Sequence, residues 1–383
     1  MMRIRTFALI ALTALLLSTA GSGWAANEVR QSPILTRSQR AFPRVGEYEI
    51  LVGDFHMHTN LSDGKVTPHD RVLEAYKYGY DVIAITDHRN FRAYNHVAGL
   101  AESLGMVLIR GFETGIHQAE HFVVLGVSGD YKPRDSHEWA EKPGEPRSYY
   151  QDELRRISEA GGSVIYVHPH MGLREPVQWG IEQGIIVGVE VKNGSGSGWN
   201  SVVFRGTNCY PTAFDWALER NLTVFADSDV HRTRPKVNEL STLVFARERT
   251  SAGVMEAIRA RRTIAQFGGM LWGRQELLSE LIKSTVTVRR VPDTTGNYIR
   301  IENRGPVAFR AVLEGYSVSG QMIDIAPYTE TMVLWNDAPE IITIRWDNLL
   351  VNPRDNLTTT YTTVHIPIPI PTPEAVNGQL ITP

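Results

Sequence analysis

The sequence predicts an α/β fold, a barrel of the TIM type with about seven units, followed by a small β-sandwich. Between residues 49 and 261, short β-branched segments alternate with helical patterns, which is the order of parallel strands covered by helices. The strand segments, such as DVIAIT and LTVFA, are apolar almost throughout, as strands buried on both faces are. After about residue 281 the helical periodicity ends, and short strand-like segments separated by turn residues predict an all-β region.

The barrel elements are predicted from apolar runs and from helix-end signals. Thr67 and Pro68 begin a helix, because threonine caps free N–H groups and proline fits the first turn. The predicted strands are 49–55, 81–86, 106–110, 121–127, 163–167, 185–191 and 222–226. The predicted helices are 67–78, 93–104, 149–160, 175–183, 210–220 and 252–261.

The sequence pattern of the C-terminal region predicts a β-sandwich. Its predicted strands are 285–290, 298–302, 307–314, 331–335, 341–347 and 360–366. From Pro367 onward proline alternates with apolar residues, which predicts an extended strap. The chain is thereby divided into a signal segment (1–25), a linker or N-terminal wrap (26–48), a barrel (49–283) and a β-sandwich-like region with the tail (284–383).

The first 25 residues have the pattern of a secretory signal peptide. Arg3 and Arg5 precede the apolar run 7–17, and segment 23–25 fits a cleavage site before Ala26. The apolar run is short for a membrane span, although an uncleaved anchor is the alternative. We expect an exported protein, periplasmic or secreted, with no membrane span after cleavage.

The composition is that of an ordinary globular protein, with 383 residues, 42% apolar and 21% charged, which excludes a disordered or fibrous chain. The formal charge is −3 and becomes −5 when segment 1–25, with its two arginines and no acidic residue, is removed. No stable nucleic-acid binding is expected from such a chain, since no strong basic field exists. The single cysteine, Cys209, excludes an intramolecular disulfide.

The strongest local signal is a set of histidines and carboxylates at the predicted strand ends. His56 and His58 lie two residues apart at the end of the first strand, so both imidazoles point to one side. In a barrel, this edge is where chemistry is placed. His88, Glu113, His168, Asp229 and His231 lie at the ends of other predicted strands, Asp63 lies in a turn after the first strand, and His121 begins its strand. Nitrogen and carboxylate ligands suit Zn, Mn or Fe, and their number implies two or three divalent ions.

The segments DFHMHTNLSDG, ITDH, GFE, HF, HP and DSDVH, in this order, resemble the PHP (polymerase and histidinol phosphatase) superfamily over residues 50–265. The resemblance implies a distorted (β/α)7 barrel and up to three metal ions. By that resemblance, His56, His58, Glu113 and Asp229 hold the first ion, Asp63, His88 and His231 the second, and Glu113, His121 and His168 the third. More narrowly, segment 257–281 followed by a β-rich region resembles exported PHP phosphodiesterases that act on small organophosphate diesters.

A metal-dependent phosphodiesterase is therefore the expected function, with a small organophosphate as substrate and a metal-activated hydroxide as nucleophile. A phosphomonoesterase of the histidinol-phosphatase type, a noncatalytic metal- or ligand-binding module, and a hydrolase of another ester or amide are the alternatives. Asp87 and Asp229 are the candidate catalytic residues. For Asp87, a role as orienter or proton carrier stands beside the alternative of a cap on the turn after the strand.

Several other residues near the strand ends remain open from the sequence alone. Arg89 and Lys192 either contact the phosphate or are surface charges, and Asn193 is a candidate substrate contact. Glu190 alternates with apolar neighbours and is expected to face the barrel interior, without a ligand role. The segment 194–198 lacks the lysine and spacing of a P-loop and is interpreted as a mobile active-site loop.

Overall fold

The fold is described from a computed structural model, which covers residues 36–115, 120–134, 149–195, 201–233, 240–293, 296–316 and 321–363. The predicted signal segment, the proline-rich tail and residues 196–198 of the predicted loop lie outside these residues. Within the described residues, no helix combines the length and the apolar character needed to cross a membrane.

Seven strands form the part of the sheet that carries the site. They are β1 (Glu49–Asp54), β2 (Val82–Ile85), β3 (Val107–Gly115), β4 (His121–Leu125), β5 (Ser163–Val167), β6 (Ile186–Asn193) and β9 (Thr223–Asp227). They are hydrogen-bonded in this order, and β1, β2 and β3 are parallel, as are β5, β6 and β9. The predicted α/β class with a largely parallel sheet is confirmed.

The first and last of these strands meet through residues just beyond their carboxyl ends. The Asp229 amide donates to the His56 carbonyl at 2.7 Å, and the His58 amide donates to the Val230 carbonyl at 3.0 Å. These bonds continue β1 and β9 as a short parallel pair. The ring of strands is therefore joined at the edge where the predicted ligands lie.

One strand runs against the predicted parallel order. β4 is antiparallel to both β3 and β5. The reason lies in the connection, because residues 116–120 are too few for the crossover that a parallel neighbour requires. The reversal places His121, the first residue of β4, opposite Gly115 and Val167, at the carboxyl ends of its neighbours.

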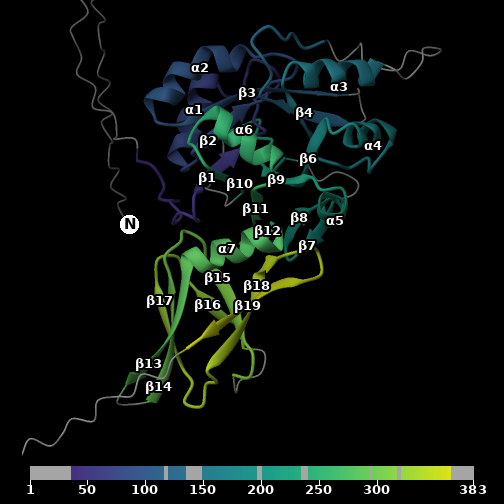
Figure 1. The fold of residues 1–383 in the computed structure, drawn as a ribbon. Helices are drawn as coiled ribbons and strands as arrows, with labels where there is room; N and C mark the ends of the chain where they lie inside the picture. Colours follow the sequence, from purple (N-terminus) through teal and green to yellow (C-terminus); the bar gives the residue numbers. More distant parts are fainter. Residues whose placement is uncertain are drawn as a thin grey trace, which may run out of the picture. The chain divides into compact units, whose positions relative to one another are not determined.

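Six helices follow the strands as predicted. They are α1 (Pro68–Lys77), α2 (Arg92–Ser103), α3 (Tyr149–Glu159), α4 (Glu175–Glu182), α5 (Pro211–Glu219) and α6 (Ser251–Arg259). The Thr67 hydroxyl accepts from the Asp70 amide at 3.2 Å, which is the predicted N-cap of α1. Figure 1 shows α1 and α2 lying next to each other outside the strands.

Strands that the sequence analysis missed extend the sheet on the other side of β1. β10 (Ser241–Ala246), β11 (Thr263–Phe267) and β12 (Met270–Gly273) continue it in antiparallel pairs. A further hairpin consists of β7 (Val202–Phe204) and β8 (Thr207–Cys209). The repeated strand–helix order predicted only parallel units, so these antiparallel additions had no place in it.

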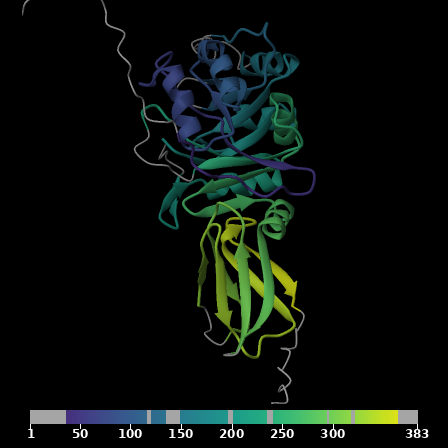
Figure 2. The same ribbon diagram turned by 90° about the vertical axis from the view of Figure 1, so that its left-hand side faces the viewer.

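The C-terminal region is built almost wholly of strands, as predicted. After α7 (Gln275–Thr285), the strands β13 (Val286–Asp293), β14 (Gly296–Asn303) and β17 (Glu330–Leu334) form one antiparallel sheet. β15 (Phe309–Leu313), β16 (Ile323–Ile325), β18 (Ile341–Leu350) and β19 (Asn356–Thr362) pair among themselves. Figure 2 shows these green and yellow strands running beside one another. β18 also pairs with β12 in parallel, so the main sheet continues into this region.

Residues before β1 pack against the start of β2 and against β10. The Arg37 guanidinium lies 2.6 Å from the Asp81 carboxylate, just before β2 begins. The Arg40 guanidinium donates to the Ser241 hydroxyl at 2.8 Å. In the described part of segment 26–48, residues 36–48, these side chains thus contact the strands that follow.

Candidate metal centre

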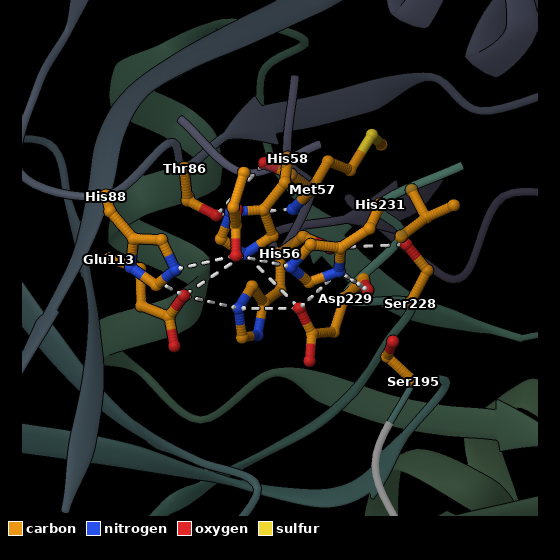
Figure 3. A network of polar contacts seen from close by, with 12 residues as sticks. His56, Met57, His58, Thr86, His88, Glu113, Ser195, Ser228, Asp229 and His231 are labelled. Atoms are coloured by element: carbon orange, nitrogen blue, oxygen red, sulfur yellow. Dashed lines mark hydrogen bonds and ion pairs between the residues drawn. The ribbon is translucent and has the colours of Figure 1, made fainter. Parts of the chain in front are cut away.

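The structure brings all nine predicted ligands together at the carboxyl edge of the strands. Each belongs to at least one group of three side chains whose donor atoms lie within 4.8 Å of one another. The nine are His56, His58, Asp63, His88, Glu113, His121, His168, Asp229 and His231. Figure 3 shows four of the imidazoles converging on the carboxylates of Glu113 and Asp229.

The deepest group consists of two histidines and two carboxylates. The Nε2 atoms of His56 and His58 lie 3.3 and 3.1 Å from Glu113 Oε2. The same two atoms lie 3.4 and 3.2 Å from Asp229 Oδ1. Both Nε2 atoms are buried, and neither has a hydrogen-bond partner of acceptable geometry among the described residues. Buried polar atoms normally have partners, so this arrangement indicates a site for a bound cation.

A second group surrounds Asp63 on the more exposed side of the cluster. Asp63 Oδ2 lies 3.3 Å from His88 Nε2 and 3.2 Å from His231 Nε2. Asp63 Oδ1 lies 3.3 Å from His58 Nδ1. His58 therefore faces the first group through Nε2 and the second through Nδ1.

Glu113 connects the deepest group to a third one. Its Oε1 atom lies 3.2 Å from His121 Nδ1 and 3.1 Å from His168 Nε2, whereas its Oε2 atom faces His56 and His58. One carboxylate thus offers one oxygen to each of two groups. This is the bridging position that the family resemblance implied for Glu113.

The electrostatics of the cluster favour added positive charge. Burial alone would lower the pKa of His56, but Asp229, Glu113 and Glu190 raise it well above the ordinary value. Burial would raise the pKa of Glu113, but the neighbouring histidines, His56 foremost, hold it well below the ordinary value. Without another cation, these carboxylates favour the protonated form of His56, so protons and divalent ions compete for the same ring nitrogen.

Glu190 is a functional residue for which sequence reasoning assigned no role. Its Oε1 atom accepts from His56 Nδ1 at 2.8 Å, which leaves His56 Nε2 as the atom that faces the cluster. Its Oε2 atom accepts from the His168 amide at 2.6 Å. A carboxylate that orients a ligating histidine in this way raises metal affinity. Its alternation with Val189 and Val191 was the signal that it faces the interior.

Asn193 holds Glu190 rather than facing open space. Its side-chain Nδ2 donates to Glu190 Oε2 at 3.0 Å, and its side-chain Oδ1 accepts from the Ser195 amide at 2.9 Å. The side chain is buried. These contacts support a positioning role in place of the predicted substrate contact. The Lys192 ammonium donates to the backbone carbonyl of Asn193, and burial lowers the pKa of Lys192.

The Asp87 carboxylate accepts hydrogen bonds from the loop that carries Asp63. Its carboxylate accepts from the Thr59 amide at 2.7 Å, from the Thr59 hydroxyl at 2.6 Å and from the Ser62 hydroxyl at 2.6 Å. Of the two roles considered for Asp87, these contacts are those of the structural cap. Gly64 completes the turn, because a Cβ there would lie 2.8 Å from the backbone of His58 and Thr59.

Asp54 and Asp227 fasten the strand ends that carry four of the ligands, a role that the sequence analysis missed. Asp54 Oδ1 accepts from the Ser228 amide at 3.1 Å, and Asp227 Oδ1 accepts from the Phe55 amide at 3.1 Å. Burial and the neighbouring Asp54 carboxylate raise the pKa of Asp227 well above the ordinary value. Each carboxyl group therefore holds the backbone of the opposite strand next to a pair of ligands.

Comparison with known proteins finds a matching domain model and a solved structure with a similar fold. The family model for the PHP domain matches residues 54–158. A solved structure from Bacteroides vulgatus, a two-domain protein containing a predicted PHP-like metal-dependent phosphoesterase, superimposes with a TM-score of 0.71. The two sequences are 26% identical, and the match covers 85% of this chain and 99% of that one. The fold is therefore that of PHP-like metal-dependent phosphoesterases, and the predicted resemblance is confirmed.

The curated relatives match over short segments only. The PolC-type DNA polymerase III of Staphylococcus saprophyticus is 37% identical over 84 residues, which is 21% of this chain and 5% of the polymerase. The corresponding protein of Streptococcus sanguinis is 38% identical over 65 residues, 16% of this chain and 4% of the polymerase. The match thus spans about one twentieth of the length of these relatives.

The Glu190→Gln variant tests whether Glu190 orients His56 for a metal ion. The amide can donate where the carboxylate only accepts, so the orientation and basicity of His56 are no longer fixed. We expect the metal affinity to fall about 10- to 100-fold, measured by competition with a chelator. The matched variant Glu182→Gln, on α4, should retain the affinity. An unchanged affinity in Glu190→Gln would show that this contact does not position a ligand.

The pH dependence of stability tests the competition between protons and metal. Without metal, the folded protein keeps protons on His56 and His58 that the unfolded chain releases above about pH 6.5. The metal-free protein should therefore lose stability as the pH rises above that value. Divalent ions replace those protons, so the increase in Tm on adding Mn or Zn should be larger at pH 8 than at pH 6. Thermal unfolding with and without chelator measures both, and an equal or smaller increase at pH 8 would contradict this account.

Proposed function

We propose that this chain, which contains a PHP domain, is a metal-dependent phosphodiesterase that hydrolyses small organophosphate diesters at a multinuclear site. The observation that carries the proposal is the set of six histidines and three carboxylates that the fold collects at one edge of the sheet. The solved relative from Bacteroides vulgatus, described as containing a PHP-like metal-dependent phosphoesterase, supports the class of reaction.

The donor set fits two or three divalent ions. Imidazole nitrogens and carboxylate oxygens are the ligands that Zn, Mn and Fe share. His56, His58, Glu113 and Asp229 would hold the first ion, Asp63, His88 and His231 the second, and Glu113, His121 and His168 the third. When bound, such ions lower the pKa of coordinated water and stabilise negative charge on phosphate oxygens.

The side chains of the protein position the ligands of this centre, and water is the proposed nucleophile. The hydroxyl of Ser62 donates to Asp87, and that of Ser228 donates to the His56 carbonyl. These two hydroxyls are thus occupied by structural bonds, which argues against Ser62 or Ser228 as a nucleophile. Glu190 keeps His56 Nδ1 protonated and directs Nε2 into the cluster. Asp229 and Glu113, buried among the imidazoles, supply the negative charge that retains the cations.

A cavity of about 640 Å³ next to the ligand cluster offers room for an organic group of the substrate, as a diester would require. It opens beside Asp63 and His88 of the second ligand group, and its volume falls within the range of small-molecule sites. A phosphate held at the cluster could therefore carry an organic substituent in this cavity as well as a leaving group. A monoester has one organic group, its leaving group, whereas a diester has a second one that this cavity could hold.

Hydrolysis of paired substrates tests this proposal. The metal-loaded chain should hydrolyse bis(4-nitrophenyl) phosphate faster than 4-nitrophenyl phosphate. His56→Ala and Asp229→Ala should each lose more than about a hundredfold of that activity, since even partners that only orient a ligand are worth 10- to 100-fold. Arg220→Gln, which alters an exposed arginine at the end of α5, is the control.

Each outcome of this assay decides between named functions. A preference for the monoester would replace the phosphodiesterase with a phosphatase of the histidinol-phosphatase type. Bound metal without hydrolysis of either substrate would indicate a binding module, or a hydrolase of a different ester or amide. Full activity in both ligand variants would contradict the metal-dependent mechanism itself.

We also propose that the protein is exported, on the strength of the signal-like segment 1–25. N-terminal sequencing of protein recovered from the periplasm of a producing bacterium should begin at Ala26. Recovery of the chain only from the cytoplasm, with Met1 retained, would contradict export.

A further inference from the structure

Three arginines line the cavity beside the second ligand group. They are Arg89 and Arg92, from the connection between β2 and α2, and Arg134. Among the described residues that line this cavity, Asp63 is the only acidic one, and it already belongs to the ligand cluster. A cation at the cluster would neutralise Asp63. The cavity would then carry a surplus of positive charge next to the reacting centre.

The arginine-bearing loop is fixed to the ligand cluster by backbone hydrogen bonds. The Arg89 amide donates to the Glu113 carbonyl at 2.9 Å, and Arg89 adopts a φ of 55°, an uncommon value outside glycine. The Asn90 side chain donates to the His88 carbonyl at 2.9 Å and accepts from the Arg92 amide at 3.1 Å. This loop therefore presents both arginines at a fixed position relative to His88 and Glu113.

Two further features favour an anion in this cavity. Arg92 is the first residue of α2, a helix of 12 residues, so the positive end of the helix dipole lies at the cavity wall. On the other side, Arg134 Nε lies 3.1 Å from Glu153 Oε2. This ion pair holds Arg134 in place and offsets its charge, so the surplus positive charge rests on Arg89 and Arg92. Guanidinium groups match the paired oxygens of carboxylates and phosphates. Arginines that served only as exposed surface charges would not need to gather around one cavity.

We infer that this cavity binds a second anionic group of the substrate, separate from the phosphate that reacts at the metal cluster. The inference rests on the proposed function and narrows its substrate class. The preferred substrate is then a small phosphoester whose organic substituent carries a carboxylate or a further phosphate. Arg89 and Arg92 contact that second group and determine specificity, while the residues of the cluster act on the ester.

Binding of phosphonates tests the inference without any turnover, because their C–P bond is not hydrolysed. Alkylphosphonates of two to four carbons are compared with chains of the same length that end in a carboxylate, and with the matching bisphosphonates. Isothermal titration of the metal-loaded full chain should give a Kd about tenfold or more lower for the probes with the anionic tail, as expected for charge-assisted hydrogen bonds. The carboxylate and bisphosphonate series distinguish the two kinds of second anion.

Variants test whether the arginines cause the tighter binding of probes with an anionic tail. Arg89→Gln and Arg92→Gln should each reduce the ratio between the two Kd values towards one, and Arg89→Lys should retain part of it. Arg220→Gln, at the end of α5, should retain the full ratio. Metal content and Tm are measured for each variant, because the Arg92 guanidinium also donates to the Leu61 carbonyl at 2.8 Å.

Three results would overturn the inference. A ratio near one in the unmodified protein would show that the cavity does not select anions. Equal weakening of both probes by the arginine variants would show that the arginines bind the reacting phosphate instead. The hydrolysis assay is run on the same preparation, and a protein that hydrolyses no phosphoester would overturn the proposed function together with the inference. A ratio near one alongside measurable hydrolysis overturns the inference alone.

Discussion

The burial of Glu113 among histidines is the interaction on which the rest of the site depends. Its side chain is 2% exposed, and its two oxygens face five different imidazoles. A buried carboxylate is costly unless positive charge compensates it. Protons on the histidines provide that charge in the absence of metal, and divalent ions provide it more strongly. The cluster is thus arranged for cations before any substrate arrives.

The fold produces this cluster by bringing strand ends to one edge. Parallel strands alone would give His56, His58, His88, Glu113, His168, Asp229 and His231 a common side. His121 joins them only because β4 is reversed, which places the start of that strand where its neighbours end. The crossed bonds of Asp54 and Asp227 then hold the strands that bear His56 and Asp229 at a fixed distance.

Much of this arrangement could be predicted from the sequence, because it follows from short-range patterns. Continuous apolar runs located the central strands, and the spacing of His56 and His58 on one strand placed both on one side. What the sequence could not supply were the contacts made across the barrel. Glu190 lies far from His56 along the chain, and only the folded barrel shows the 2.8 Å bond between them. The same holds for the strands β10 to β12. The antiparallel pairing of β10 with β1, of β11 with β10 and of β12 with β11 depends on tertiary packing rather than on a local period.

The number of bound ions per chain tests the central claim most directly. Elemental analysis of the metal-loaded, dialysed protein should find two or three divalent ions per chain. Glu113→Gln should lose more than one of them, because its two oxygens serve two groups, while Asp63→Asn should lose about one. One ion or fewer per unmodified chain, or a Glu113→Gln variant that retains them all, would contradict the account of a multinuclear centre built around Glu113.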